Sequence, residues 1–103
     1  MLPACAPDSC LAAFKREDYF VAYRLCLPLA EQGDAAAQSI LGARYGAGHG
    51  LALDYIEGYK WIILAAEQGE EVANQWLSLF GSVLSPQQIA EAQKRAAEWR
   101  KTH

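Results

Sequence analysis

The sequence contains few of the residues that carry catalytic and metal-binding chemistry. There are two histidines and three cysteines, and no C-x-x-C pair, so a zinc site with the usual ligand spacing is not expected. His49 stands between glycines and His103 ends the chain, and local spacing places neither beside a carboxylate. The glycines of residues 46–50 follow a predicted helix instead of a strand and lack the lysine of a phosphate-binding loop. We therefore expect a protein that is not an enzyme and holds no cofactor or metal.

Long apolar runs and clustered positive charge are missing as well. No apolar run approaches the roughly 18 residues that a membrane-spanning helix needs, so no membrane span is expected. The net charge of -3 has the wrong sign for a protein that binds nucleic acid. Residues 1–85 carry five basic and ten acidic side chains, whereas residues 86–103 carry four basic and two acidic ones, and we interpret this basic segment as a solvated helix face. The first basic residue is Lys15, so the sequence as it stands predicts no signal peptide.

The sequence does have enough apolar material for one globular domain. Of its 103 residues, 52% are hydrophobic and 20% are charged, a composition typical of a folded chain. We expect residues 1–8 to be a flexible N-terminus and residues 9–103 to form a single domain. β-branched residues are sparse, alanine, leucine and glutamine are frequent, and apolar positions recur three and four residues apart, so the expected fold class is all-α.

The three cysteines, Cys5, Cys10 and Cys26, permit two interpretations. An odd number without metal-ligand spacing is typical of free thiols buried in a core. Alternatively, Cys10 and Cys26 form a disulfide across the first helix pair, which would require an oxidising compartment. The sequence leaves both open.

An internal repeat with a period of 36 residues runs through the middle of the chain. Residues 18–41 and 54–77 share nine identical positions, where ordinary composition gives about one or two. The longest match pairs residues 30–33 with residues 66–69, both reading AEQG. Self-similarity at a fixed period of this size indicates a stacked array in which each unit is a pair of helices.

Several residues mark where these helices begin and end. Asp34 is placed to cap the helix that follows it, and Gly33 and Gly69 stand where a left-handed C-cap is needed. Ser85, with proline next and glutamine three residues on, predicts a helix that runs from Pro86 to about Lys101. This last helix puts four apolar side chains on one face, namely Ile89, Ala92, Ala96 and Trp99.

The central segment has small and aromatic residues at fixed spacings: Ala37-Gln38, Leu41-Gly42, Tyr45, Gly48, Gly50, Asp54, Tyr59, Trp61 and Ala65-Ala66-Glu67-Gln68-Gly69. This pattern resembles the Sel-one-like repeat, a relative of the tetratricopeptide repeat. The resemblance implies an α-α superhelix, or solenoid, of helix hairpins. Its units would be a tetratricopeptide-like hairpin at 9–33, a full Sel-one-like repeat at 34–69, and a degenerate half repeat with a C-terminal capping helix at 70–101.

The spacings of this pattern also make a physical prediction about the core. Gly42 would let the partner helix approach closely, so that Leu41 and Tyr45 pack against Tyr59 and Trp61. We expect these aromatic side chains to be structural and to have no role in binding a cofactor.

The resemblance implies a non-catalytic protein–protein interaction module or adaptor, because such superhelices bind partners on the face formed by the first helix of each pair. By the register of the repeat, we expect an extended peptide or protein to bond to glutamines on that face and to pair an acidic group with Arg44. Trp76 either packs under the last helix or is a partly exposed anchor. The expected partner-binding residues are Gln38, Ser39, Arg44, Gln75, Trp76 and Leu79.

Two other functions are kept as alternatives. One is a structural protein whose exposed repeat edge forms a homo-oligomer, which a large apolar patch near Trp76 or Trp99 would favour. The other is a cell-wall or β-lactam hydrolase, as has been proposed for some members of the family. The resemblance points to a bacterial protein that is cytoplasmic or, if a leader was removed, periplasmic or secreted.

Overall fold

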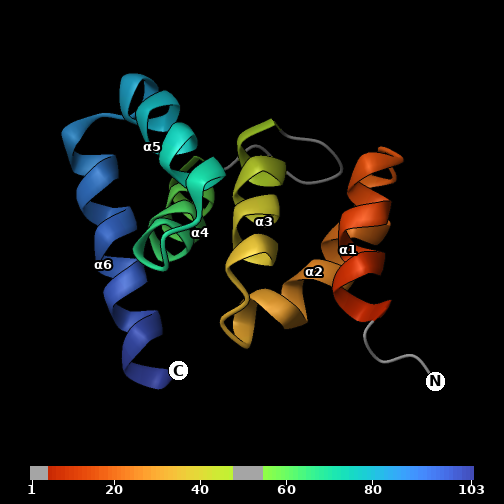
Figure 1. Ribbon diagram of the computed structural model, residues 1–103. Coiled ribbons are helices and arrows are strands. Elements are labelled where there is room, and N and C mark those ends of the chain that lie inside the picture. Colours follow the sequence, from red (N-terminus) through yellow and green to blue (C-terminus); the bar gives the residue numbers. More distant parts are fainter. Residues whose placement is uncertain (1–4, 48–54) are drawn as a thin grey trace.

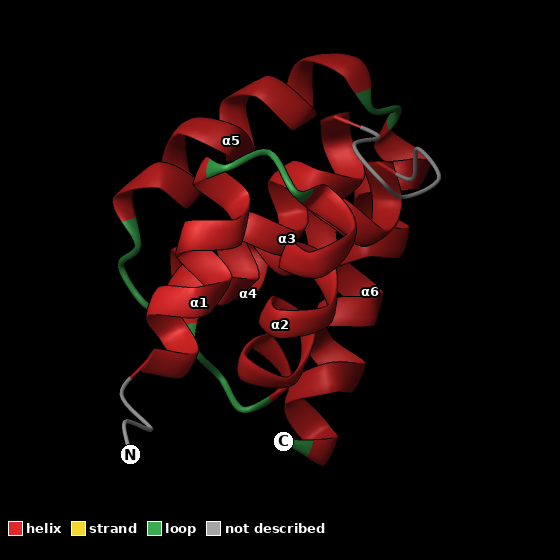
Figure 2. Ribbon diagram, turned by 90° about the vertical axis from the view of Figure 1, so that its right-hand side faces the viewer, coloured by secondary structure: helices red, strands yellow, loops and turns green. Residues whose placement is uncertain are grey.

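Six α-helices make up the part of the chain that the computed structural model describes, residues 5–47 and 55–103 (Figure 1). These residues contain no strand, as Figure 2 shows, so the all-α fold class is confirmed. The first helix begins at Cys5, and it therefore includes residues 5–8, which the sequence assigned to a flexible N-terminus. The helices are α1 (Cys5–Lys15), α2 (Tyr19–Glu31), α3 (Ala35–Ala47), α4 (Tyr55–Glu67), α5 (Glu71–Val83) and α6 (Pro86–Thr102).

The helix bounds follow the 36-residue period of the sequence. α2 and α4 are both 13 residues long and begin at Tyr19 and Tyr55. α3 and α5 are also 13 residues long and begin at Ala35 and Glu71. The two copies of the repeated sequence therefore form helices of the same length at matching positions.

The turns before α3 and α5 are built in the same way. Gly33 and Gly69 have φ angles of 99° and 86°, a left-handed conformation that glycine adopts without the steric cost of a Cβ. Asp34 then caps α3, because its Oδ1 accepts a hydrogen bond of 2.9 Å from the backbone N–H three residues further on. Glu70 caps α5 through the equivalent bond of 3.0 Å. The predicted cap at Asp34 and the predicted glycine termini are confirmed.

Ser85 starts the last helix with a reciprocal capping box. Its Oγ accepts a hydrogen bond from the backbone N–H of Gln88 at 3.2 Å, and Gln88 Oε1 accepts one from the backbone N–H of Ser85 at 2.9 Å. Pro86 follows in the first turn, where a missing N–H has no cost. The helix start predicted at this position is confirmed.

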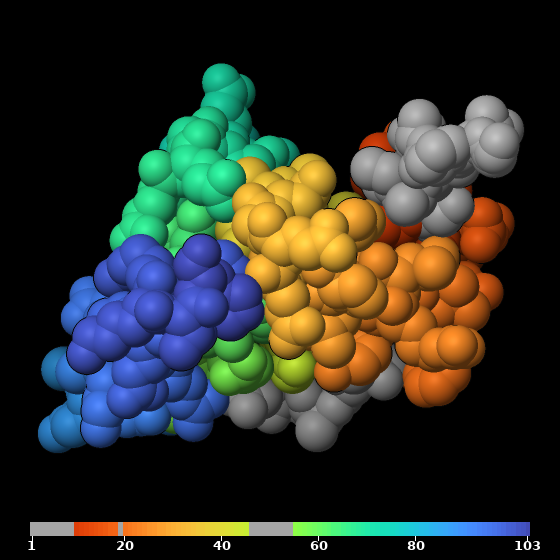
Figure 3. Space-filling model, turned by 90° about the horizontal axis from the view of Figure 1, so that it is seen from below, coloured from red at the N-terminus to blue at the C-terminus, as the bar shows by residue number. Residues whose placement is uncertain are grey.

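The helices follow one another from right to left across Figure 1, and the chain extends over 45 × 27 × 22 Å. Each of the first four helices packs against the next, and α3 lies in the middle, in contact with α1, α2, α4 and α5. α6 packs against α4. Figure 3 shows the end of α6 beside the segment that joins α2 to α3.

The core consists of two clusters of buried side chains. The first joins α1, α2, α3, α4 and α6 and includes Cys10, Cys26, Leu41 and Trp61. Trp99 of α6 packs against this cluster and meets the Trp61 ring edge-on, with the ring centroids 6.1 Å apart. The second cluster joins α4, α5 and the start of α6 and is composed of Ile62, Ala65, Ala73, Phe80 and Leu84.

The closest helix contact is between α3 and α4, at Gly42 and Gly58. A Cβ added to Gly42 would overlap the side chain of Ile62 and lie 3.0 Å from the carbonyl oxygen of Gly58. The predicted close approach at Gly42 is therefore confirmed. Tyr45 packs against the first core cluster as expected, but Tyr59 packs against the second one, where its ring lies 6.0 Å from that of Phe80.

α6 is held on α4 by small buried residues and two ion pairs. Ala92 and Ala96 have no exposed surface. Beside them, Arg95 lies 3.0 Å from Glu57, and Arg100 contacts Glu67 at 2.8 Å. The side chains of Arg95 and Arg100 stay 36% and 45% exposed in these pairs, in agreement with the interpretation of the basic segment as a solvated face, and each pair contributes only about 0–1 kcal/mol.

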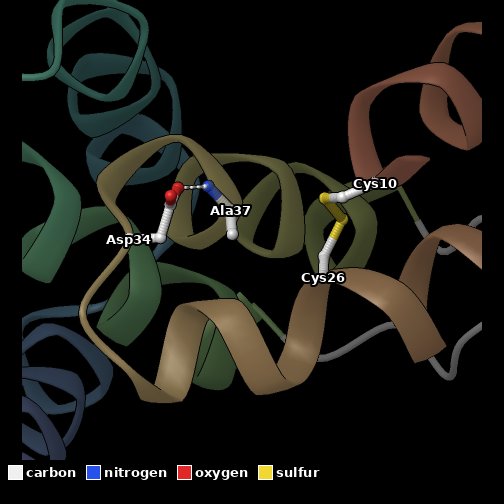
Figure 4. Close-up of a disulfide and its surroundings, with 4 residues drawn as sticks. All are labelled: Cys10, Cys26, Asp34 and Ala37. Atoms are coloured by element: carbon white, nitrogen blue, oxygen red, sulfur yellow. Dashed lines mark hydrogen bonds between the residues drawn. A yellow bond between two sulfur atoms is a disulfide. The ribbon is translucent and has the colours of Figure 1, made fainter. Parts of the chain in front are cut away.

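A disulfide between Cys10 and Cys26 joins α1 to α2 (Figure 4). Both residues are buried, and their Cα atoms are 5.1 Å apart, within the range that a disulfide spans. The structure thus favours the second of the two interpretations of the cysteines, and the free-thiol interpretation is wrong for this pair.

Candidate functional site

A strongly apolar recess lies where α1, α3 and the start of α5 come together. It has a volume of about 190 Å³. We call it the α1–α3 recess, and its lining residues are Leu11, Phe14, Ala36, Ser39, Ile40, Ala43, Glu70 and Val72. Leu11 and Val72, on opposite sides, are 41% and 48% exposed. Glu70 is the one charged side chain in this lining, so the recess suits an apolar group.

The ring of Phe14 packs against the buried side chain of Arg44. The guanidinium carbon of Arg44 lies 4.5 Å from the centroid of the Phe14 ring, which is a cation–π distance. Arg44 is only 3% exposed, so it supports the wall of the recess from inside the protein. The predicted role of Arg44, to pair with an acidic group of a partner on the surface, is therefore wrong.

Gln38 is also inside the protein. It has no exposed surface, its Nε2 donates a hydrogen bond of 3.0 Å to the Ala30 carbonyl, and its Oε1 accepts one of 3.0 Å from Gln68. Because both ends of this amide bond to the protein itself, Gln38 is not a surface residue that binds a partner. The prediction that it bonds to a peptide backbone is wrong.

The central position of α3 explains these two corrections. Four other helices contact α3, so most of its circumference is covered. Ser39 and Ala43 are 5% and 4% exposed and still line the recess, whereas Ile40 is only partly covered. The open side of α3 is therefore a narrow strip of small and aliphatic residues that includes Ser39 but not the predicted Gln38 and Arg44.

The three residues predicted on α5 are nearer to the surface. Gln75 is exposed, Leu79 is 58% exposed, and Trp76 is partly buried with its ring centroid 5.9 Å from that of Phe80. Trp76 and Leu79 also line a second recess of about 300 Å³ with Tyr55, Phe80, Ser82 and Val83. The six predicted residues therefore do not form one site. Three are buried on α3, and the other three lie nearer to the surface on α5.

A third and larger recess, of about 580 Å³, lies between α4, α5 and α6. It is more polar than the others, with Tyr59, Asn74 and Gln93 among its lining residues. Glu67 and Arg100 also line it, and they are paired with each other.

Within residues 5–47 and 55–103 no three His, Cys, Asp or Glu side chains are grouped as a metal site would need. His103 stacks on Trp99 with the ring centroids 4.2 Å apart, and His49 lies outside the described residues. None of the helices in these two ranges has the length and hydropathy that crossing a membrane requires.

The sequence interpretation missed the residues that give the α1–α3 recess its character. Leu11 and Phe14 are three residues apart on α1, and Ile40 and Val72 come from the two other helices. The spacing of Leu11 and Phe14 indicates that they share a helix face, but nothing local indicates that this face meets α3 and α5. That contact depends on how the hairpins stack.

Comparison with known proteins adds no further identification. The chain matches no protein-family model, no curated protein and no solved structure.

Proposed function

We propose that this protein is a non-catalytic binding module that takes apolar side chains of a partner polypeptide into the α1–α3 recess. The observation that carries this proposal is the lining of the recess, in which seven of eight side chains are uncharged and two aliphatic ones, Leu11 and Val72, stay substantially exposed. Concave sites with such a lining favour aliphatic or aromatic groups. The volume of about 190 Å³ suits one or two such side chains, so the partner is an extended or helical peptide segment rather than a small polar metabolite.

The architecture that we propose is a short α-α superhelix of the tetratricopeptide type, similar to Sel-one-like repeats. Two features support it: the matching bounds of α2 with α4 and of α3 with α5, and the contacts of α3 with both α1 and α5. In such an array the first helices of successive pairs form one continuous face. The α1–α3 recess lies on that face.

The disulfide supports a place of action outside the reducing cytoplasm. Disulfides persist in oxidising compartments, and Cys10–Cys26 joins the helix that forms one wall of the recess to its hairpin partner. We therefore propose a periplasmic or secreted protein. Mass spectrometry of protein isolated from its own cells under thiol-blocking conditions should find the pair oxidised.

The function is tested by selecting binders from a library of random peptides and measuring their affinities for three forms of the protein. These are the wild type, Leu11→Lys in the recess, and Phe20→Lys as a matched control. Phe20 is 62% exposed on α2 and lines none of the recesses described above. We expect the selected peptides to be rich in apolar residues, Leu11→Lys to weaken binding about tenfold or more, and Phe20→Lys to leave it unchanged. Equal affinities for all three forms would contradict the proposal.

A further inference from the structure

The outer side of α5 carries an apolar stripe that none of the described helices covers. We call it the α5 stripe, and it consists of Val72, Trp76, Leu79 and Val83. Val72 is 48% exposed, and Leu79 and Val83 are each 58% exposed. In Figure 2, α5 runs along the upper edge of the molecule, with no other described helix beyond it. Trp76 is partly buried against the second core cluster, so Val72, Leu79 and Val83 supply most of the exposed apolar surface. Exposed apolar side chains grouped in this way mark a contact surface.

The spacing within the stripe is that of a helix–helix seam. Its four residues are separated by four, three and four positions, which is the alternation of a heptad repeat. The neighbouring side of the same helix, about 100° around its axis and including Ala73 and Phe80, is already packed in the second core cluster. α5 thus has one apolar side for its own core and a second one with the period that suits a partner helix.

The charge of this segment decides among possible partners. Residues 72–90 contain no charged side chain, although 20% of the whole chain is charged. The exposed residues along one flank of the stripe are the neutral Gln75, Ser78 and Ser82, with the charged Glu71 at its N-terminal end. Such a surface gives an acidic or basic partner nothing to pair with, and it also does not repel a copy of itself, even though the protein has a net charge of -3.

We propose that the α5 stripe is a self-association site, in which α5 of a second copy of this chain packs antiparallel against it. The spacing of four, three and four residues reads the same in both directions. A reversed copy therefore places Val72 opposite Val83 and Trp76 opposite Leu79, which is the self-complementary contact of a two-fold dimer. This inference does not rest on the proposed peptide binding, although Val72 belongs to both the stripe and the lining of the α1–α3 recess.

The acidic start of α5 agrees with the antiparallel direction. A parallel pair would bring together Glu70 and Glu71 of both copies, whereas an antiparallel pair separates them by about the helix length, roughly 20 Å. The recess of about 300 Å³ beside Trp76 and Leu79 is lined on its other side by Tyr55 and Phe80. It offers room for an aliphatic side chain from the second copy.

The first test is the mass of the protein by sedimentation equilibrium between low and high micromolar concentration. We expect the wild-type mass to rise from 11.3 kDa toward twice that value. Leu79→Lys should stay monomeric at concentrations where the control Phe20→Lys dimerises like the wild type. A wild type that stays monomeric, or a Leu79→Lys variant that dimerises as the wild type does, would overturn the proposal. Leu79 does not line the α1–α3 recess, so peptide binding and dimerisation can fail separately.

A second experiment tests the antiparallel alignment. Val72→Glu and Val83→Lys each place a charge opposite valine, and each should weaken the dimer about tenfold or more. Both substitutions suit the helix dipole, so α5 should still form, which circular dichroism checks. The double variant places the new acid and base opposite each other and should recover most of the lost affinity. A double variant that dimerises no better than either single variant would overturn the antiparallel pairing.

Discussion

The buried side chain of Gln38 accepts a hydrogen bond of 3.0 Å from Gln68, a residue 30 positions further along the chain. Gln68 also donates a bond of 2.8 Å to the carbonyl of Gly33, and Gln38 donates one of 3.0 Å to the carbonyl of Ala30. The end of α4 is thereby tied to the end of α2, which is the preceding copy of the same repeated sequence. These bonds link the two copies through polar groups as well as through apolar contacts.

Replacing this amide should destabilise the fold. Gln38→Ala removes a buried hydrogen bond to the Ala30 carbonyl and empties a fully buried site, so we expect the free energy of unfolding to fall by about 1–3 kcal/mol. Urea denaturation followed by circular dichroism measures this change. The control Gln87→Ala, at an exposed position of α6, should change the value by no more than about 0.5 kcal/mol. Equal effects of the two substitutions would show that the buried amide contributes nothing specific.

The two glycines Gly42 and Gly81 should respond to alanine in opposite directions. A Cβ at Gly42 meets Ile62, which has no exposed surface and little room to move, so Gly42→Ala should cost about 1–3 kcal/mol. A Cβ at Gly81 meets nothing within 4 Å, and Gly81→Ala should stabilise α5 by about 0.5–1 kcal/mol. Thermal and urea denaturation of both variants checks the signs. A stabilising Gly42→Ala would contradict the close packing of α3 on α4.

Removing the disulfide should lower stability by a larger amount. Cys10 and Cys26 are 16 residues apart, and a loop of this size corresponds to about 3 kcal/mol in the chain-entropy description. We therefore expect the double variant Cys10→Ala/Cys26→Ala to unfold at clearly lower urea concentration than the wild type. The single variant Cys5→Ala keeps the pair and serves as the control. A reducing agent should destabilise the wild type but not the double variant, which has no Cys10–Cys26 disulfide to reduce. Equal destabilisation of the two forms would contradict a stabilising role of this disulfide.

Reversing the charge of Arg44 should damage the fold and not only a surface. Arg44 is 3% exposed against Phe14, so Arg44→Glu places a carboxylate in a buried site beside an aromatic ring. We expect a loss of about 3 kcal/mol or more. Arg24→Glu is the matched control, because Arg24 is exposed on α2 and lies above the ring of the exposed Phe20. A thermal denaturation midpoint of Arg44→Glu equal to that of the control would contradict the burial of Arg44.

The sequence predicted local structure well where the signal is local. Asp34, Ser85 and the glycines at 33 and 69 act within three or four residues of themselves, and their positions suffice to place the helix termini. The close approach of α3 and α4 at Gly42 was also predicted, because a glycine in the middle of a helix pair lets the two helices pack without an intervening side chain.

The candidate site was harder to predict because exposure depends on how many neighbours each helix has. The register of the repeat predicted that one side of α3 is open and that Gln38 and Arg44 lie on it, whereas both side chains are buried. In this short chain α3 is the central helix, and contacts from four sides bury most of it. Leu11 and Val72 belong to the site only because α1 and α5 both reach α3, a long-range result that no local pattern contains.

The central claim is that the α1–α3 recess binds apolar side chains of a partner, and the position of a bound peptide tests it most directly. Titrating a selected apolar peptide into isotope-labelled protein, while recording amide chemical shifts, locates the contact. The account predicts that the largest shifts fall on Leu11, Phe14, Ile40 and Val72, with little change in α6. Shifts centred on the recess between α4, α5 and α6, around Tyr59 and Gln93, would contradict it.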